Sequence, residues 1–356
     1  MKNASPLDLL EATRLTQEGR LVEATAAIQR LLRQQAMHEP VNEAAPGRII
    51  DAEFSRVEEP RAEARQPDGQ PGQFISASFG NHAGTRPYKL YIPTGYAGEP
   101  LPLIVMLHGC TQSPDDFAAG TRMNALAEER GCFVLYPGQT RAANRSRCWN
   151  WFKRGDQRHG KGEPAILAGM TRECMSRYAI DSRRVYVAGL SAGGAMAAVL
   201  AAAYPDLYAA VGVHSGLAVG SAHDVQSAFA AMQGTPATRS TVRKRAAGSV
   251  PAIVFHGDRD TTVHPRNGEQ VIVEWVDPAA ASSVEQGQVP GGHAYTRTIH
   301  RDSTGRVLFE HWLVHGAGHA WSGGSPSGSY TDPKGPDAAR AMLRFFDQTE
   351  RADLMP

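Results

Sequence analysis

The residues whose types and spacing most clearly indicate a chemical role are Gly189, Ser191 and Gly193, which form a G-x-S-x-G pattern. An apolar segment, 185–188, precedes the pattern and an alanine-rich segment follows it, as in a strand that turns sharply into a helix. Such a turn strains the backbone and lifts the serine hydroxyl clear of the sheet. We therefore predict that Ser191 is a nucleophile. The alternative is a helix N-cap, but an N-cap does not need glycines on both sides.

A serine hydroxyl is a weak nucleophile near neutral pH, so it needs a histidine base that is held by a carboxylate. In this architecture the chain order is serine, acid, histidine. After the apolar run 251–257 the H-G-x-x-D-x-x-V spacing favours Asp260 as the acid, with Asp258 as the alternative. His319, in a glycine-rich segment after the last apolar run, is the predicted base, and His315 is its alternative.

Attack on a carbonyl places negative charge on its oxygen, which two backbone N–H groups usually stabilise. We expect one from Ala192, the residue after the nucleophile. The other is expected from Cys110, in the His-Gly-Cys segment that follows the apolar run 101–107. The alternative for that segment is an ordinary turn after a strand.

Aromatic residues gather in the segment Cys148–Phe152. Trp149 and Trp151 offer flat apolar area for a substrate, and buried packing is the equal alternative. Trp321, two residues after His319, is predicted to line the cleft, and Tyr330 is a further candidate.

The chain has four cysteines, and none of them has a zinc-binding spacing. Two interpretations stay open: four reduced, mostly buried thiols, or one or two disulfides, of which Cys110–Cys148 is favoured. The four are Cys110, Cys132, Cys148 and Cys174.

Alternating strand and helix patterns must position these residues. Strands are expected at 74–80, 86–93, 101–109, 131–137, 184–191, 209–216, 251–258 and 307–316, and helices at 114–130, 163–179, 191–205 and 337–348. This alternation predicts an α/β fold with a mostly parallel sheet covered by helices on both faces. The segment 217–249 interrupts it, and we expect an insertion there whose basic run, 239–245, is a solvated face.

Three regions are expected along the chain. Residues 1–35 have the periodicity of an amphipathic helical segment, 36–73 have the proline-rich and charged composition of a linker, and 74–350 form the catalytic domain. Acidic residues interrupt the apolar start, so we expect no signal peptide and a cytoplasmic location. The helical segment is expected to pack on the domain or to make a dimer contact; attachment to a polymer granule is the alternative.

Composition narrows the class of protein. Of the 356 residues, 42% are hydrophobic and 21% charged, which is ordinary for a soluble globular protein. Thirty-seven basic and 36 acidic residues give a net charge of +1, which argues against a nucleic-acid binder. No stretch approaches the roughly 20 apolar residues of a membrane span. The oligomeric state stays open.

Five motifs in order resemble the polyhydroxybutyrate depolymerases and the related feruloyl and acetylxylan esterases. They are LHGCTQ, CWNWF, GLSAGG, HGDRDTTV and GAGHAWSGG, and the resemblance covers about residues 74–348. It implies an α/β-hydrolase fold of the non-permuted type, a triad of Ser191, Asp260 and His319, and an oxyanion hole at Cys110 and Ala192. No metal and no organic cofactor are expected.

The resemblance predicts a serine esterase that hydrolyses polyhydroxyalkanoate-type polyesters or their oligomers. We expect no signal peptide and no polymer-binding module after the last expected helix, and both would be departures from the secreted members. These departures favour amorphous granules, oligomers or small esters as substrate. The alternatives are a feruloyl or acetylxylan esterase and, more remotely, a non-catalytic binding protein of hydrolase fold.

Overall fold

A computed structural model describes residues 72–235, 250–273, 276 and 281–351. The chain divides into two units, Met1–Asp68 and Gly69–Pro356, and every described residue lies in the second. The amphipathic segment 1–35, the linker as far as residue 71 and the basic run 239–245 therefore lie outside the described residues. Within them, the first strand begins at Gln73, next to the expected domain start at residue 74.

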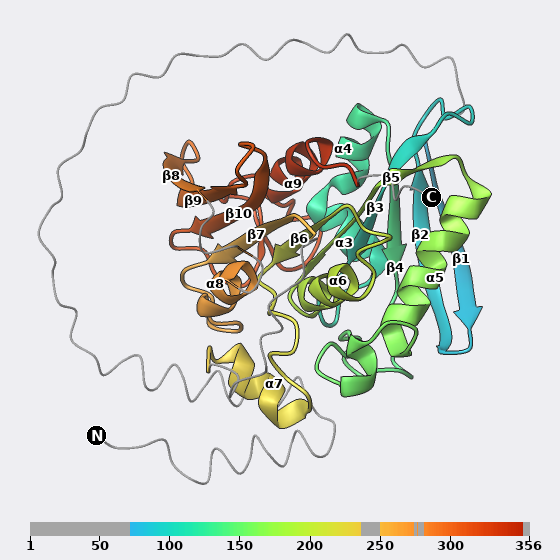
Figure 1. Cartoon of the computed structure of the whole chain (residues 1–356), viewed down its shortest axis with the longest axis horizontal. Helices are drawn as coiled ribbons and strands as arrows, with labels where there is room; N and C mark the ends of the chain where they lie inside the picture. The colour runs from blue at the N-terminus through green and yellow to red at the C-terminus, as the bar shows by residue number, and fades with distance from the viewer. Residues whose placement is uncertain (1–71, 236–249, 274–275, 277–280, 352–356) are drawn as a thin grey trace, which may run out of the picture. The chain divides into compact units, whose positions relative to one another are not determined.

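A large mixed sheet forms the centre of the second unit (Figure 1). Its strands are β1 (Gln73–Asn81), β2 (Gly84–Ile92), β3 (Leu101–Leu107), β4 (Phe133–Pro137), β5 (Ile180–Leu190), β6 (Ala210–His214), β7 (Ala252–Gly257), β8 (Ala281–Gln288), β9 (Ala294–Arg301) and β10 (Val307–Val314). Their order is β1-β2-β4-β3-β5-β6-β7-β10-β9-β8. From β4 to β10 neighbouring strands are parallel, and at each border strands pair antiparallel.

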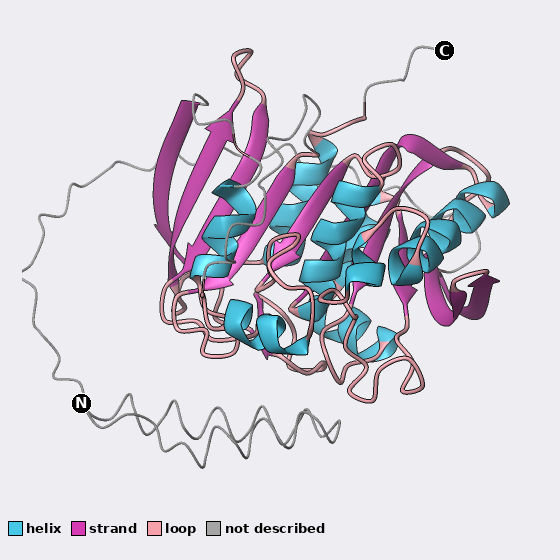
Figure 2. Ribbon diagram, turned by 60° about the horizontal axis from the view of Figure 1, so that its bottom comes forward, coloured by secondary structure: helices cyan, strands magenta, loops and turns pink. Residues whose placement is uncertain are grey.

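The helices that the structure describes are α3 (Pro114–Thr121), α4 (Met123–Arg130), α5 (Gly162–Arg177), α6 (Ala192–Ala203), α7 (Val225–Met232), α8 (Arg266–Val273) and α9 (Ala338–Asp347), with a 3-10 turn at Arg154–Gln157. Figure 2 shows helices on both sides of the sheet. The predicted α/β-hydrolase class is confirmed. Among the described residues no helix is long and apolar enough to cross a membrane.

Alternate residues of the central strands feed two hydrophobic clusters. In β3, Leu103 and Val105 belong to one cluster, while Ile104 and Met106 belong to the other. Successive side chains of a strand point to opposite faces, so a strand covered on both faces needs a continuous apolar run. Helices α5, α6 and α8 contribute to the first cluster, and α3, α4 and α9 contribute to the second.

Several elements differ from expectation, and the helices α7 and α8 are among those that were not expected. The helix expected at 114–130 is two helices, because Arg122 takes the left-handed conformation (φ 55°) and starts a new axis. The antiparallel strands β8 and β9 at one border were not expected at all. β8 is almost wholly exposed and polar, so it carries no alternation of apolar and polar residues.

Candidate active site

Ser191 lies on the sharp turn between β5 and α6. Its backbone has φ 57° and ψ −120°, a conformation that few non-glycine residues adopt. The turn packs against the end of β3 so closely that a Cβ on Gly193 would lie 2.1 Å from the Leu107 carbonyl oxygen. A Cβ on Gly189 would lie 2.4 Å from the Gly193 carbonyl carbon. Both glycines of the pattern are therefore required by close backbone approach.

Asp260 and His319 form a buried pair. His319 Nδ1 lies 2.7 Å from Asp260 Oδ2, and the two side chains are 13% and 0% exposed. The other carboxylate oxygen, Oδ1, accepts the backbone N–H groups of Thr262 (2.9 Å) and Val263 (2.8 Å). Burial alone would raise the pKa of Asp260, but hydrogen bonds from His256 and His319 outweigh it and hold the pKa well below its usual range. The carboxylate is therefore ionised and can only accept, so His319 Nδ1 carries a proton and Nε2 is free to accept one.

The two alternatives pair with each other instead. His315 Nδ1 lies 3.0 Å from Asp258 Oδ2, and the side chains are 40% and 32% exposed. Asp258 Oδ1 also accepts the Gly316 N–H at 2.7 Å, so this acid holds the end of β10. The structure thus separates this partly exposed pair from the more buried pair of Asp260 and His319.

His214, which sequence reasoning passed over, connects the serine turn to the loop of His319. Its carbonyl oxygen accepts the Ser191 N–H at 2.8 Å. Its ring Nε2 accepts the Ser322 N–H at 2.9 Å, and the ring stacks on that of Trp321 with centroids 5.1 Å apart. Both segments therefore meet at the carboxyl end of β6. A histidine at a strand end gives no signal in the sequence that separates this role from ordinary packing.

The segment that contains Cys110 lies against the serine turn. Gln112 Oε1 accepts the Gly109 N–H at 2.9 Å, which fixes the loop after β3. Cys110 is joined to Cys148 by a disulfide, so the favoured pairing is the one the structure has. Within the described part of the chain, the N–H groups of Cys110 and Ala192 donate no hydrogen bond. Both are therefore available to a developing oxyanion.

The structure corrects the expectation for the tryptophans. Trp149, Trp151 and Trp321 are only 0%, 6% and 1% exposed, so none presents an aromatic face to a substrate. Trp149 Nε1 instead donates to the His108 carbonyl oxygen at 3.1 Å, from behind the loop of Cys110. The buried alternative was right for Trp149 and Trp151. Trp321, which was predicted to line the cleft, is buried as well, because its ring packs against Phe117 and stacks on His214.

Glu163 holds the segment that contains Trp149 and Asn150. At the start of α5 it is 3% exposed and accepts hydrogen bonds from the Asn150 backbone and side chain, both at 2.7 Å. Gln139 and Arg86 also donate to it. Burial raises the pKa of Glu163, although these hydrogen bonds oppose the rise. No sequence signal distinguishes this glutamate from a surface acid in the first turn of a helix.

Three histidines with lowered pKa values make stability depend on pH. Burial lowers the pKa of His108 and of His311 to about 4 and of His214 to about 3, from 6.5. A lowered histidine pKa gives stability that is complete above pH 6.5 and lost as the pH falls, by up to about 1.4 kcal/mol per pH unit for each histidine. We expect the urea midpoint to fall steadily from pH 6.5 to pH 4. The lowered pKa of Asp260 adds to the loss below about pH 4, whereas Glu163, whose pKa is raised above its usual value, takes up a proton at higher pH and opposes part of the loss there.

Urea titrations at half-unit pH steps measure this slope, and a His214→Gln variant should show a shallower one. A midpoint that stays constant between pH 6.5 and pH 4 in the unmodified protein contradicts the prediction.

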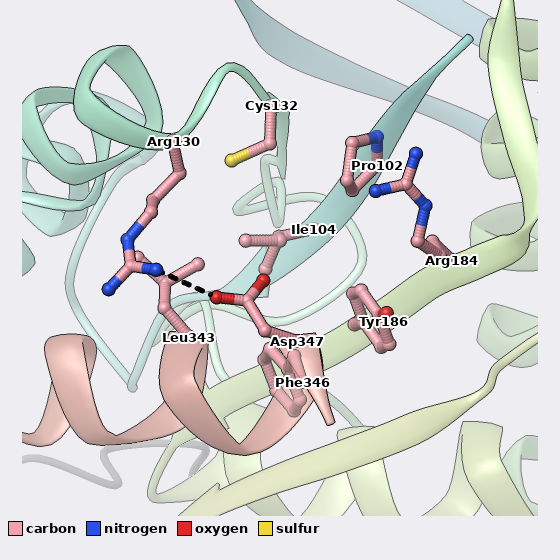
Figure 3. A pocket seen from close by; sticks show the side chains of 9 residues that line it. All are labelled: Pro102, Ile104, Arg130, Cys132, Arg184, Tyr186, Leu343, Phe346 and Asp347. Carbon is pink, nitrogen blue, oxygen red and sulfur yellow. Dashed lines mark hydrogen bonds and ion pairs between the residues drawn. The ribbon is translucent and has the colours of Figure 1, made fainter. Parts of the chain in front are cut away.

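One pocket of about 160 Å³ lies away from these residues (Figure 3). Pro102 and Ile104 of β3 line it together with Arg184 of β5, near the amino ends of both strands. Ser191 follows the carboxyl end of β5, so the pocket and the serine lie at opposite edges of the sheet. Among the described residues, no group of three or more histidine, cysteine, aspartate or glutamate side chains is arranged to hold a metal.

A strained turn serine, a buried histidine–carboxylate pair and two unpaired N–H groups at one sheet edge are the parts that a serine hydrolase of the α/β-hydrolase class requires. The chain belongs to the esterase PHB depolymerase family, whose model matches residues 86–280, more than half of its length.

Three relatives illustrate the family. Poly(3-hydroxyalkanoate) depolymerase C of Paucimonas lemoignei is 31% identical over 253 residues, covering 68% of this chain and 60% of the depolymerase. Feruloyl esterase B of Thermothelomyces thermophilus is 29% identical over 256 residues, covering 68% and 86%. A solved acetyl xylan esterase of Aspergillus awamori matches with a TM-score of 0.59 at 22% identity, covering 78% of this chain and 100% of that one. The last likeness shows the shared fold.

Proposed function

We propose that the chain hydrolyses uncharged carboxylic esters through an acyl-enzyme, with Ser191 as nucleophile, His319 as base and Asp260 as the acid that orients it. The observation that carries the proposal is the buried contact of 2.7 Å between His319 and Asp260, in a chain whose only G-x-S-x-G serine lies on a strained turn. Family membership supports the reaction class.

The first half of the reaction forms the acyl-enzyme. His319 Nε2 takes the Ser191 proton as the hydroxyl attacks the ester carbonyl. The oxyanion accepts hydrogen bonds from the backbone N–H groups of Cys110 and Ala192. The imidazolium is stabilised by ionised Asp260 and then protonates the leaving alcohol. In the second half, His319 takes a proton from water, the hydroxide attacks the acyl carbon, and Ser191 leaves with its proton restored.

For the substrate, we propose a hydroxyalkanoate polyester in amorphous form, or its oligomers. The depolymerase relative supports this choice, and the chain's net charge of +1 is consistent with an uncharged ester. A feruloyl or acetylxylan ester is the second candidate, because the chain covers most of the length of the feruloyl esterase and all of the solved acetyl xylan esterase. Granule attachment through residues 1–35 and a cytoplasmic location stay predictions.

A substrate panel tests the proposal. Purified full-length protein is given amorphous poly(3-hydroxybutyrate), 3-hydroxybutyrate trimer, methyl ferulate and acetylated xylan, and product acid is measured by chromatography. We expect the highest kcat/KM on the trimer and release of soluble acid from the polymer. Faster turnover of ferulate or acetyl groups favours the second candidate, and no turnover of any ester overturns the proposed function.

Tyr330 is the aromatic residue best placed to meet the substrate. It is 49% exposed, and its hydroxyl lies 3.3 Å from Thr111 Oγ1, next to Cys110. Its carbonyl oxygen accepts the Trp321 N–H at 2.7 Å, and its backbone is left-handed (φ 53°). We propose that this ring contacts the acyl chain beside the scissile ester.

Replacing Tyr330 by alanine should raise KM for the hydroxybutyrate trimer about fivefold, the loss of one partly desolvated aromatic contact. The effect on kcat for p-nitrophenyl acetate should be under about twofold, because this small ester does not reach the ring. Initial-rate kinetics on both esters measure the difference. Tyr330→Phe should keep most of the affinity, and Val284→Ala, at another exposed position, is the matched control. An unchanged KM for the trimer excludes the contact.

A further inference from the structure

A second histidine contacts the acid of the candidate triad. His256, at the carboxyl end of β7, is 0% exposed, and its Nε2 lies 3.4 Å from Asp260 Oδ2. This is the oxygen that His319 Nδ1 reaches at 2.7 Å. Two imidazoles therefore meet one carboxylate oxygen, one from the loop after β10 and one from the strand that carries the acid.

The hydrogen bonds define which nitrogen of His256 carries the proton. Nε2 lies 2.8 Å from the Val263 carbonyl oxygen, which can only accept. Ionised Asp260 can also only accept, and its Oδ2 lies beside the same Nε2–H at the longer distance of 3.4 Å. In the neutral ring Nδ1 is then unprotonated, and His256 acts on Asp260 as a donor.

The opposite side of the ring is closely packed. A Cβ on Gly268 of α8 would lie 2.9 Å from His256 Nδ1 and 3.2 Å from His311 Nε2. Both of these buried nitrogens lack a hydrogen-bond partner within the described residues. His256 is thus wedged against Asp260 by a helix that has room for no side chain at this point.

We propose that His256 is a positioning residue for Asp260. Its Nε2–H attracts the negative charge on Asp260 Oδ2 and keeps that oxygen aimed at His319. The proposal rests on the proposed function, since it assigns to His256 an effect on the reaction through Asp260. His256 itself touches neither substrate nor the reacting atoms.

Few other charges act on this cluster. The titratable groups that face Asp260 and His256 are His319, His214 and His311. Burial lowers the pKa of His214 to about 3 and of His311 to about 4, so both are neutral while the enzyme works near neutral pH. A change in the number of donors to Asp260 should therefore reach His319 without interference from other charges.

The test compares His256→Leu with His256→Gln, whose amide N–H can replace the Nε2–H. For p-nitrophenyl butyrate, the leucine variant should lose about tenfold in kcat with KM within about twofold. The acidic limb of its kcat/KM profile should move to higher pH by about half a unit, because Oδ2 then directs more charge to the His319 proton. The glutamine variant should regain most of both. His311→Leu removes a partly buried histidine that does not contact Asp260, and its acidic limb should not move.

Three results would overturn the proposal: an unmoved acidic limb in His256→Leu, equal effects in His311→Leu, or no rescue by glutamine. If the leucine variant does not fold, Gly268→Ala replaces it, because its methyl group must displace the His256 ring and the limb must then move. Failure here leaves the proposed function intact as long as the unmodified enzyme hydrolyses the ester. Absence of ester hydrolysis in the unmodified enzyme defeats the proposed function itself.

Discussion

Replacing Ser191 by alanine is expected to lower kcat for p-nitrophenyl butyrate by at least about 10⁴-fold. Without the hydroxyl no acyl-enzyme forms, and the residual rate comes from substrate binding and the oxyanion hole alone. The fold should survive, because the Ser191 side chain makes no capping hydrogen bond to α6 and the neighbouring glycines, which permit the close packing, are unchanged.

Rates and thermal melting are measured on the same preparation. A fluorophosphonate probe should label the unmodified protein at Ser191 by mass spectrometry and should not label the variant. Ser215→Ala is a matched control, because this neighbouring buried serine lies at the end of β6 and also has a positive φ (48°). Turnover retained by Ser191→Ala, in a folded protein, would assign the reaction to another nucleophile.

Replacing Asp260 by asparagine is expected to lower kcat about 10³- to 10⁴-fold with little change in KM. The amide can donate to His319 Nδ1, which would then hold its proton on Nε2 and could not accept one from Ser191. The buried contact of 2.7 Å leaves the ring no second partner in this role among the described residues.

Asp258→Asn is the matched control for this prediction. Asp258 lies two residues away and also pairs with a histidine, but that pair is partly exposed and holds the end of β10. We expect its kcat within about threefold of the unmodified enzyme, as for most surface substitutions. The opposite pattern, loss with Asp258→Asn and retention with Asp260→Asn, would transfer the acid to the other pair.

The positions of the central strands along the chain could be predicted because these strands are apolar runs, and four of the five motifs, all but CWNWF, overlap or directly follow such a run. A parallel sheet brings all carboxyl ends of its strands to one edge, so Ser191, Asp260 and His319 had to approach one another once the runs were recognised as strands. The local glycines gave the close approach as well, since only glycine fits where Gly193 meets the Leu107 carbonyl.

What could not be predicted depends on contacts between distant segments. The sequence around Trp149 does not tell whether its ring is buried or binds substrate. In the structure the ring is buried, and its Nε1 donates to the carbonyl oxygen of His108, which is distant in the sequence. His256 and His214 lie at strand ends, where a histidine gives no sequence signal for its partner. Their partners, Asp260 and Ser322, lie on other segments. β8 escaped notice because an exposed border strand needs no apolar face.

Because Cys110 and Cys148 form a disulfide, the redox conditions under which the protein is made should affect its turnover. The disulfide closes a separation of 38 residues, for which the chain-entropy model gives a stabilisation of about 4 kcal/mol. Thiols made in a reducing cytosol stay reduced, whereas an oxidising compartment forms such bonds. A preparation made without an oxidant would carry a freer loop at one of its two oxyanion donors. Two batches of the same chain would then differ in turnover although their sequences are identical and their masses differ by only two hydrogen atoms.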